Sequence, residues 1–472
     1  MAASHWRRGA RARKAALLVG MLPLLAPAEA VPGEPVWKVG LARAKITPEK
    51  PVFLIGYRRP PKPFEGVIND IFAKALALED RQGRRGLLIT TDLVGIQASV
   101  ARRVCARVQE KSGLVEEQIL LNSSHTHCGP LLSLDPGEIS PPGKATPSPE
   151  EFRETVAYTK QLCDKLAEIA AEALSDLQPA RLAWGTGTAP AFVVNRRKPG
   201  PKGIWLGANP DGPIDPAVAV LRVTAPGGEL RAVVFGCACH STAVSSRHNQ
   251  ICGDYPGFAQ EYLETLHPGV QAMFMMGCGA DAAPRPSGAV ELARAHGASL
   301  GKEVGRVLQT ELSPIRGPLQ TRMQRVELPL RQFKSDDELK RLGLQNWILA
   351  WVAGQLMAIR RRGEKPPTHY SCPIALWQFG GDLTLVALPG ETVVDYSILL
   401  RQRLGPDGIW VAGYNNDLFG YLPSARLLAE GGGIETMGLY YGGVGVFTPQ
   451  VEEVVLDEVC RLAKLAGRPL PP

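Results

Sequence analysis

A short apolar strand that runs into two histidines is the strongest constraint on how this chain folds. Residues 118–121 are mostly apolar, and Gly129-Pro130 a few residues later is a turn signal. Between them, His125 and His127 are separated by one residue, and extended backbone projects such side chains to the same side. Two imidazoles facing one point suit a metal ion, or a metal ion beside a catalytic base. The alternative is a pair of hydrogen-bonded loop histidines.

The segments around this strand alternate between strand and helix patterns. Residues 72–79 and 85–93 read as strands, residues 99–112 as an amphipathic helix stopped by Gly113, and the histidine strand follows. This βαβ order predicts an α/β fold whose ligand site lies at strand C-terminal ends. We also expect an edge strand at 37–47, strands at 181–185, 191–195, 217–223, 232–239, 272–276 and 410–413, a hairpin over 374–388, and helices at 150–177, 256–266, 290–309, 347–359 (buried), 392–404 and 448–466.

Composition and the N-terminus bound the class of protein. A 45% hydrophobic and 21% charged composition over 472 residues is ordinary for a globular protein with a substantial core. With no linker between cores and no solenoid repeat, we expect one large domain over 31–472, and we expect its fold to have mixed β-sheets flanked by helices. Residues 1–30 have a basic start, an apolar stretch at 15–26 and Ala28-Glu29-Ala30, the order of an export signal. We therefore expect a periplasmic or secreted protein; the alternative is an uncleaved anchor. Part of the +7 net charge lies in this segment, so no nucleic-acid partner is expected.

Nine cysteines are an odd number, so an exported chain would leave at least one unpaired. Cys237, Cys239 and Cys252 lie near His240 in the sequence. They would form either a thiolate metal site or a group of small buried residues, with one disulfide at most. We prefer the second interpretation because free cysteine is commonly buried.

Other strand ends also carry residues suited to chemistry. His240 follows the apolar strand 232–239, and Glu391 follows Pro389-Gly390 at the start of a helix, where an anion is favoured. Two histidines and a carboxylate are a common ligand set for catalytic zinc. Spacing alone does not show that these residues meet. Each has a structural alternative: a buried core histidine for His240, a helix-capping partner for Glu391, a packed aromatic for Tyr421 and a solvated charge for Arg196.

Several short motifs, in order along nearly the whole chain after the signal, resemble the N-terminal catalytic domain of neutral (non-lysosomal) ceramidases. The most specific are the His-Thr-His-x-Gly-Pro and Pro-Gly-Glu pieces. The matching stretches are Val39-Gly40, Ile46-Thr47-Pro48, Gly56-Tyr57, Ser124-His125-Thr126-His127-Cys128-Gly129-Pro130, Val194-Asn195-Arg196, Cys239-His240, Gly253-Asp254, Leu388-Pro389-Gly390-Glu391 and Asn416 with Gly420-Tyr421.

The resemblance implies a zinc-dependent amidohydrolase with a small-molecule or lipid amide substrate, and leaves contact with a membrane surface open. Zinc would activate a water for attack on the amide carbonyl. Arg196 and His127 would stabilise the developing oxyanion together with the metal. The family's metal ligands fall on His125, His240, Glu391 and Tyr421.

Four departures from the family pattern limit what the resemblance implies. The family's active-site serine is Ala283 here, with Arg285 nearby; Cys128 stands where ceramidases usually have serine; and Lys45 stands where the family usually has aspartate. No C-terminal immunoglobulin-like domain is expected after the last helix. We therefore expect a hydrolase, and keep open a zinc-binding member of the fold that binds its ligand without turnover. Phosphate-ester hydrolysis is disfavoured, because no strand end offers a nucleophilic serine or threonine beside aspartate-rich metal ligands.

Overall fold

The computed structural model describes Met1 and residues 37–57, 62–135, 150, 152–201, 203–441 and 443–471. The expected export signal at 1–30 lies outside the described residues, apart from Met1. Within the part that is described, no helix is both long and apolar enough to cross a membrane.

The larger sheet is mixed and has the strand order β10-β9-β8-β5-β1-β2-β3-β4, with β12 added beside β5. The pairs β3–β4 and β9–β10 are parallel, and the other neighbours are antiparallel. The predicted βαβ unit is therefore confirmed as β3-α1-β4. The strands are β1 (Trp37–Lys45), β2 (Phe72–Glu79), β3 (Arg85–Thr91), β4 (Ile119–Ser123), β5 (Gln178–Thr188), β8 (Ala217–Thr224), β9 (Leu230–Cys237), β10 (Gln271–Met276) and β12 (Ser313–Ile315).

A second mixed sheet packs face to face on the first. Its order is β13-β14-β15-β17, with only the β15–β17 pair parallel. Alternate residues of β2 show how the layers form, because Leu76 and Leu78 pack into the core between the sheets while Ala75 and Ala77 face helices. The strands are β13 (Leu319–Pro329), β14 (His369–Phe379), β15 (Leu383–Ala387) and β17 (Ile409–Ala412).

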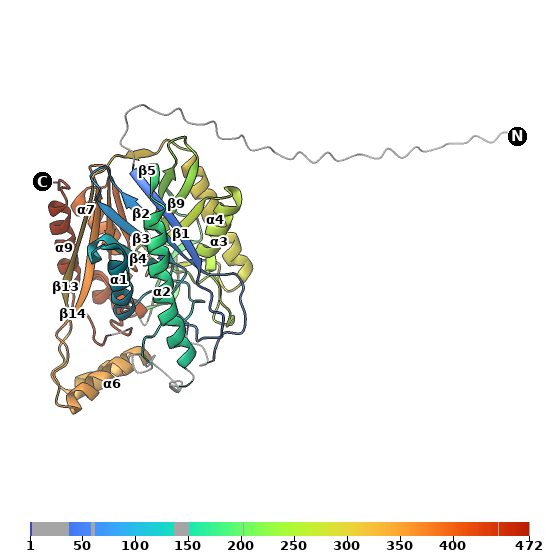
Figure 1. Ribbon diagram of the computed structural model, residues 1–472. Helices are drawn as coiled ribbons and strands as arrows, with labels where there is room; N and C mark the ends of the chain where they lie inside the picture. Colours follow the sequence, from blue (N-terminus) through green and yellow to red (C-terminus); the bar gives the residue numbers. More distant parts are fainter. Residues whose placement is uncertain are drawn as a thin grey trace.

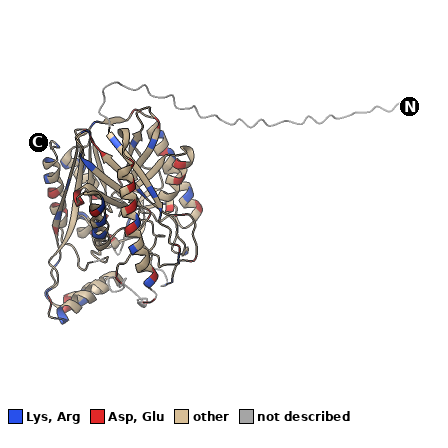
Figure 2. Ribbon diagram, viewed as in Figure 1, with Lys and Arg blue, Asp and Glu red and all other residues tan. Residues whose placement is uncertain are grey.

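Helices cover both outer faces, which gives a four-layer helix–sheet–sheet–helix arrangement (Figure 1). α1, α2, α3 and α4 cover the larger sheet, and α7 and α9 cover the smaller one. Charges of both signs are interspersed along the helices while the strands are largely uncharged, as burial requires (Figure 2). The helices are α1 (Ala98–Ser112), α2 (Arg153–Ser175), α3 (Asp254–Leu266), α4 (Val290–Leu308), α5 (Asp336–Gly343), α6 (Trp347–Arg361), α7 (Val394–Leu404), α8 (Ala425–Glu430) and α9 (Val451–Leu465).

Two small sheets lie outside these layers and carry residues of the site. One has the order β11-β6-β7, and the other is a two-residue parallel pair of β16 and β18. Their bounds are β6 (Val193–Gly200), β7 (Gly203–Asn209), β11 (Ala282–Pro284), β16 (Glu391–Thr392) and β18 (Tyr421–Leu422).

The predicted fold class, α/β with mixed sheets flanked by helices, is confirmed, but three local predictions were wrong. β1 is not an edge strand, since it lies between β5 and β2; only Trp37–Val39 pair with β5, so the remainder keeps the alternating pattern of an edge. β6 continues past Asn195 to Gly200 and pairs with β7, which was missed because this short segment contains Gly203 and Gly207 and shows no alternation of apolar and polar residues. α6 buries one face only, against α5 and the segment near Met437, and lies away from the sheets (Figure 1).

Candidate active site

Two strand ends of the larger sheet place the histidines together. β4 is followed by His125 and β9 by His240, and the segments after these strands pair at Thr126 and Ser241. The backbone N–H of His127 donates to the carbonyl oxygen of Ser241 at 3.3 Å. His125 has a φ of 59°, a conformation that costs energy for a residue with a Cβ and is often found at functional sites. The strand-end placement predicted from sequence is therefore observed.

Four side-chain atoms converge at this point. The Nε2 atom of His125 lies 3.1 Å from Nε2 of His240 and 3.0 Å from Nε2 of His127. The Oε2 atom of Glu391 lies 3.3 Å from His125 Nε2 and 3.2 Å from His240 Nε2. His125, His240 and Glu391 are buried, and His127 is partly exposed. Among the described residues, the three histidines form a group able to hold a metal ion.

The hydrogen bonds behind the rings show that a cation fits this point. His125 Nδ1 donates to the carbonyl oxygen of Val94 at 2.6 Å, and His240 Nδ1 donates to that of Gly279 at 3.0 Å. A carbonyl only accepts, so each Nδ1 carries the proton and each Nε2 of a neutral ring presents a lone pair. Glu391 Oε2 is buried without a hydrogen-bond donor in the described residues. Facing acceptors repel one another unless a cation lies between them, as in a metal site.

The electrostatic surroundings favour the metal-binding forms of these residues. Burial, helped by the charge of Arg196, lowers the pKa of His240 to about 3. Desolvation, with His125 close by, lowers the pKa of His127 well below its ordinary value. Burial alone would raise the pKa of Glu391, but the neighbouring His125 and His240 outweigh it and hold that pKa well below its ordinary value. Neutral imidazoles and an ionised carboxylate are the states that bind zinc.

The Pro-Gly-Glu turn fixes Glu391 from behind. Gly390 has a φ of 65°, and a Cβ there would lie 2.7 Å from Cζ of Phe419, so only glycine fits. Glu391 pairs with Tyr421 across the β16–β18 ladder. Its Oε1 accepts a hydrogen bond from the Tyr440 hydroxyl at 2.7 Å, which leaves Oε2 directed at the histidines. These contacts explain the position of Glu391 without the alternative role of a helix-capping partner.

Arg196 and Tyr421 form the neighbouring part of the site. Arg196 is only 4% exposed, which excludes the solvated-charge alternative. Its Nη2 donates to the Tyr421 hydroxyl at 2.8 Å, and the Tyr421 ring is stacked on His240 with centroids 6.4 Å apart. Burial raises the pKa of Tyr421 well above its ordinary value, against the lowering effect of Arg196. The structure thus brings all six sequence-predicted residues together, with Tyr421 contacting the arginine directly.

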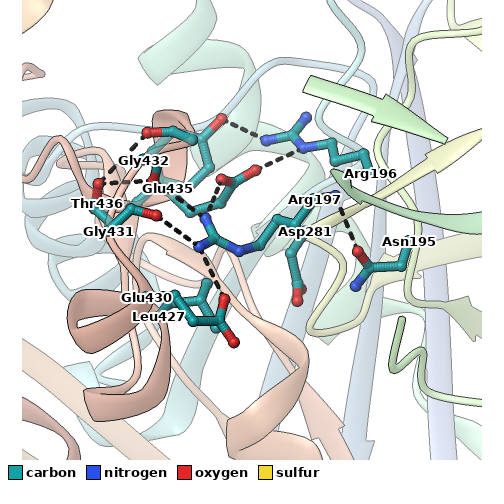
Figure 3. A network of polar contacts seen from close by, with 12 residues as sticks. Asn195, Arg196, Arg197, Asp281, Leu427, Glu430, Gly431, Gly432, Glu435 and Thr436 are labelled. Atoms are coloured by element: carbon teal, nitrogen blue, oxygen red, sulfur yellow. Dashed lines mark hydrogen bonds and ion pairs between the residues drawn. The ribbon is translucent and has the colours of Figure 1, made fainter. Parts of the chain in front are cut away.

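Sequence reasoning missed three residues of the site. Tyr440 holds Glu391, and Glu435 accepts a hydrogen bond from Nε of Arg196 at 2.9 Å (Figure 3). The Tyr414 ring packs against His125 in a tilted arrangement with centroids 4.5 Å apart, and its buried hydroxyl has no hydrogen-bond partner among the described residues. Tyr414 follows the end of β17, a strand-end position like that of His240, whereas Tyr440 and Glu435 lie in segments without periodicity. The pair of tyrosines at 440–441 and the glycine run before Glu435 were the available signals.

The departures from the family pattern also have definite places. Ala283 is buried in β11 opposite Val194, two residues after Asp281, whose carbonyl oxygen accepts the Arg196 backbone N–H at 2.8 Å. Cys128 packs among apolar residues that include Cys252. All nine cysteines are described and none forms a disulfide. Burial raises the pKa of Cys237 to about 12, which agrees with small buried residues and disfavours a thiolate metal site.

Comparisons with known proteins find neutral ceramidases among the proteins similar to this chain. Neutral ceramidase A of Dictyostelium discoideum is 24% identical over 249 residues, which cover 50% of this chain and 33% of that protein. Neutral ceramidase of Drosophila melanogaster is 29% identical over 97 residues, 20% of this chain and 14% of that protein. The matches thus span a third or less of the length of these relatives.

The solved structure of neutral ceramidase from Pseudomonas aeruginosa has the same fold, with a TM-score of 0.72 and 21% identity, covering 91% of this chain and 74% of that one. The model of the family described as "Neutral/alkaline non-lysosomal ceramidase, N-terminal" matches residues 37–289. That range is more than half of the 472 residues. The chain therefore belongs to the neutral/alkaline non-lysosomal ceramidase family.

Proposed function

We propose that this protein is a zinc-dependent hydrolase that cleaves an amide bond, with N-acyl lipids as the substrate class. The observation that carries the proposal is the buried convergence of His125 Nε2, His240 Nε2 and Glu391 Oε2 beside Arg196. Zinc bound there would supply Lewis-acid polarisation and a water of lowered pKa. The family membership supports the choice of an amide over an ester or a phosphate.

Each residue then has a distinct role. His125, His240 and Glu391 would hold the metal, and Tyr421, whose hydroxyl accepts a hydrogen bond from Arg196, would complete the set. His127 lies beside the ligands and helps to stabilise the oxyanion. Arg196 uses two of its five N–H groups on Glu435 and Tyr421. The others are available to donate to the carbonyl oxygen as negative charge develops on it.

Ala283 bears on which amide is cleaved. The relatives that match this chain are named neutral ceramidases. A buried methyl group cannot replace a hydroxyl that hydrogen-bonds the reacting amide or its alcohol, so we expect ceramide to be a poor substrate. The same residue is the observation that favours the second candidate function, ligand binding without turnover.

A single assay series tests both candidates. The purified protein is analysed for metal and incubated with ceramide and a panel of other N-acyl amines, before and after treatment with a chelator. We expect bound zinc, hydrolysis of at least one amide, loss of activity on chelation and recovery on adding zinc. The variant Arg196→Ala is the control, because it should retain zinc and lose rate. Bound zinc and bound ceramide with no product from any amide would instead support the binding protein.

We also propose that the protein is exported and cleaved after Ala30, leaving residues 31–472 as one catalytic domain. The motive is the order of basic residues, apolar stretch and Ala-x-Ala at the N-terminus. Expression in a bacterial host, fractionation and N-terminal sequencing measure this directly. A cytoplasmic product that still begins at Met1 would contradict it.

A further inference from the structure

Two consecutive arginines of β6 are buried on the same side of the site. Arg196 and Arg197 are each 4% exposed, although successive residues of a strand normally point to opposite faces. The register between β6 and β7 shifts between Asn195 and Arg197. Such an irregularity re-aims side chains and is common beside active sites. It allows both guanidinium groups to reach one carboxylate.

That carboxylate belongs to Glu435. Its Oε1 accepts from Nε of Arg196 at 2.9 Å, and its Oε2 accepts from Nη1 of Arg197 at 2.8 Å (Figure 3). Glu435 is 1% exposed, so these contacts are shielded from water. A buried charge of this kind is tolerated only when it is paired and hydrogen-bonded, and removal of one partner is costly.

Arg197 also holds the loop that carries Glu435. Its guanidinium donates to the carbonyl oxygens of Gly431 and Gly432 at 3.2 and 3.3 Å, and to Oε2 of Glu430 at 3.1 Å. Gly433 has a φ of 67°, and a Cβ there would clash with both Arg197 and Glu435. The glycine run 431–433 therefore lies close around the Arg197 guanidinium. Its path brings the Glu435 carboxylate to the Arg196 guanidinium as well.

We infer that Glu435 is a positioning residue that fixes the Arg196 guanidinium and balances its charge. One bond at Nε and one from Nη2 to Tyr421 set the plane of the group. With its charge already paired, Arg196 serves as a hydrogen-bond donor to a neutral amide carbonyl and not as the anchor of a substrate carboxylate. This inference rests on the proposed function, and it narrows the substrate class to amides that carry no negative charge near the scissile bond.

The first test compares two glutamates that contact the same arginine. Glu435→Gln keeps the size of the side chain and removes its charge. Glu430→Gln does the same to a carboxylate that, within the described part of the chain, hydrogen-bonds Arg197 and not Arg196. On a fluorescent short-chain N-acyl amine we expect Glu435→Gln to lower kcat by about 10- to 100-fold. Bound zinc should stay unchanged, and Glu430→Gln should stay within about twofold of the unmodified protein. Equal losses in the two variants would overturn the inference.

A double-mutant cycle tests whether Glu435 acts through Arg196. If it does, Glu435→Gln made in an Arg196→Ala background lowers kcat by less than about twofold further, because the group it positions is gone. Losses that multiply would show an independent role. If Glu435→Gln does not fold, Glu435→Asp, which keeps the charge and shortens the reach, takes its place in the cycle.

Substrate charge and arginine spectroscopy complete the test. The unmodified protein should prefer a neutral N-acyl amine over an N-acyl amino acid of equal chain length, and Glu435→Gln should narrow that preference. An unchanged ratio of the two hydrolysis rates would contradict the charge-balancing role.

With 15N-labelled arginine, the Arg196 Nε–H resonance, assigned by its loss in Arg196→Ala, should exchange slowly with solvent. Its exchange should quicken in Glu435→Gln and not in Glu430→Gln. This readout needs no substrate, so it distinguishes failure of the positioning role from failure of the proposed hydrolase activity.

Discussion

Two buried polar clusters lie side by side in this protein and are built on opposite principles. The group that we propose as the metal site, called the metal cluster and defined as His125, His240 and Glu391, directs three acceptor atoms at one point with no donor between them. The arginine cluster, defined as Arg196, Arg197 and Glu435, pairs both carboxylate oxygens with guanidinium N–H groups. The first is electrostatically incomplete without a cation. In the second both carboxylate oxygens already have donors, and Glu430 supplies a second negative charge for the two guanidinium groups. We therefore expect the metal cluster to bind a cation and the arginine cluster to hold the Arg196 guanidinium in place.

The largest expected effect comes from breaking the metal cluster. His125→Ala and His240→Ala should each lose bound zinc and reduce amide hydrolysis to background, because one histidine and Glu391, with only the weak ligand Tyr421 beside them, hold zinc poorly. Metal analysis of the purified variants measures this, with the exposed His369→Ala as the matched control. If His127→Ala loses zinc while His125→Ala retains it, the roles within the histidine pair are reversed.

Breaking the arginine cluster should separate metal binding from catalysis. Arg196→Ala is expected to keep its zinc and lower kcat by about 100- to 1,000-fold, the usual cost of removing one oxyanion donor. Tyr421→Phe should keep most of the metal and also lose activity, since its hydroxyl accepts from Arg196. Metal content and kcat measured on the same preparations give the comparison. Loss of zinc from Arg196→Ala would show that the two clusters are not independent.

Metal removal should affect stability as well as activity. A ligand present at 100 times its Kd stabilises the folded state by about 2.7 kcal/mol. Thermal unfolding with and without chelator should therefore show a lower Tm for the metal-free protein. His125→Ala, which has no metal to lose, should be insensitive to the chelator. A shift of equal size in both proteins would show that the chelator acts elsewhere.

The smallest change concerns Ala283, which belongs to neither cluster. Ala283→Ser should raise ceramide turnover by about 10- to 100-fold, because a hydrogen bond within a buried site contributes about 1–3 kcal/mol. Zinc content and Tm should change little. If ceramide hydrolysis is already fast and Ala283→Ser does not alter it, Ala283 does not determine the substrate specificity of this protein.

Sequence reasoning recovers some parts of this molecule and not others for physical reasons. Apolar strands and amphipathic helices such as 72–79 and 99–112 have a period that local sequence reveals. The strands before His125 and His240 were found in the same way, so these histidines could be placed at strand ends. The metal and arginine clusters could not be joined, because contacts such as that of Arg196 with Glu435 span 239 positions. Glu435 itself is held by a glycine loop with no periodicity. The expectation that His125, His240, Glu391 and Tyr421 belong to one site came from the motifs shared with the family, and not from sequence spacing.

The order of the site residues along the chain has a consequence for biosynthesis. A nascent chain that has emerged as far as residue 289 contains the three histidines and Arg196, but Glu391, Tyr421 and Glu435 are still to be made. The strand pair that holds Glu391 beside Tyr421 also needs the last fifth of the chain. Contacts of such long sequence separation form late because closing long loops is entropically costly. The proposed ligand set is therefore completed only when the last fifth of the chain has folded, and a chaperone or protease that encounters the chain earlier meets the histidines without Glu391.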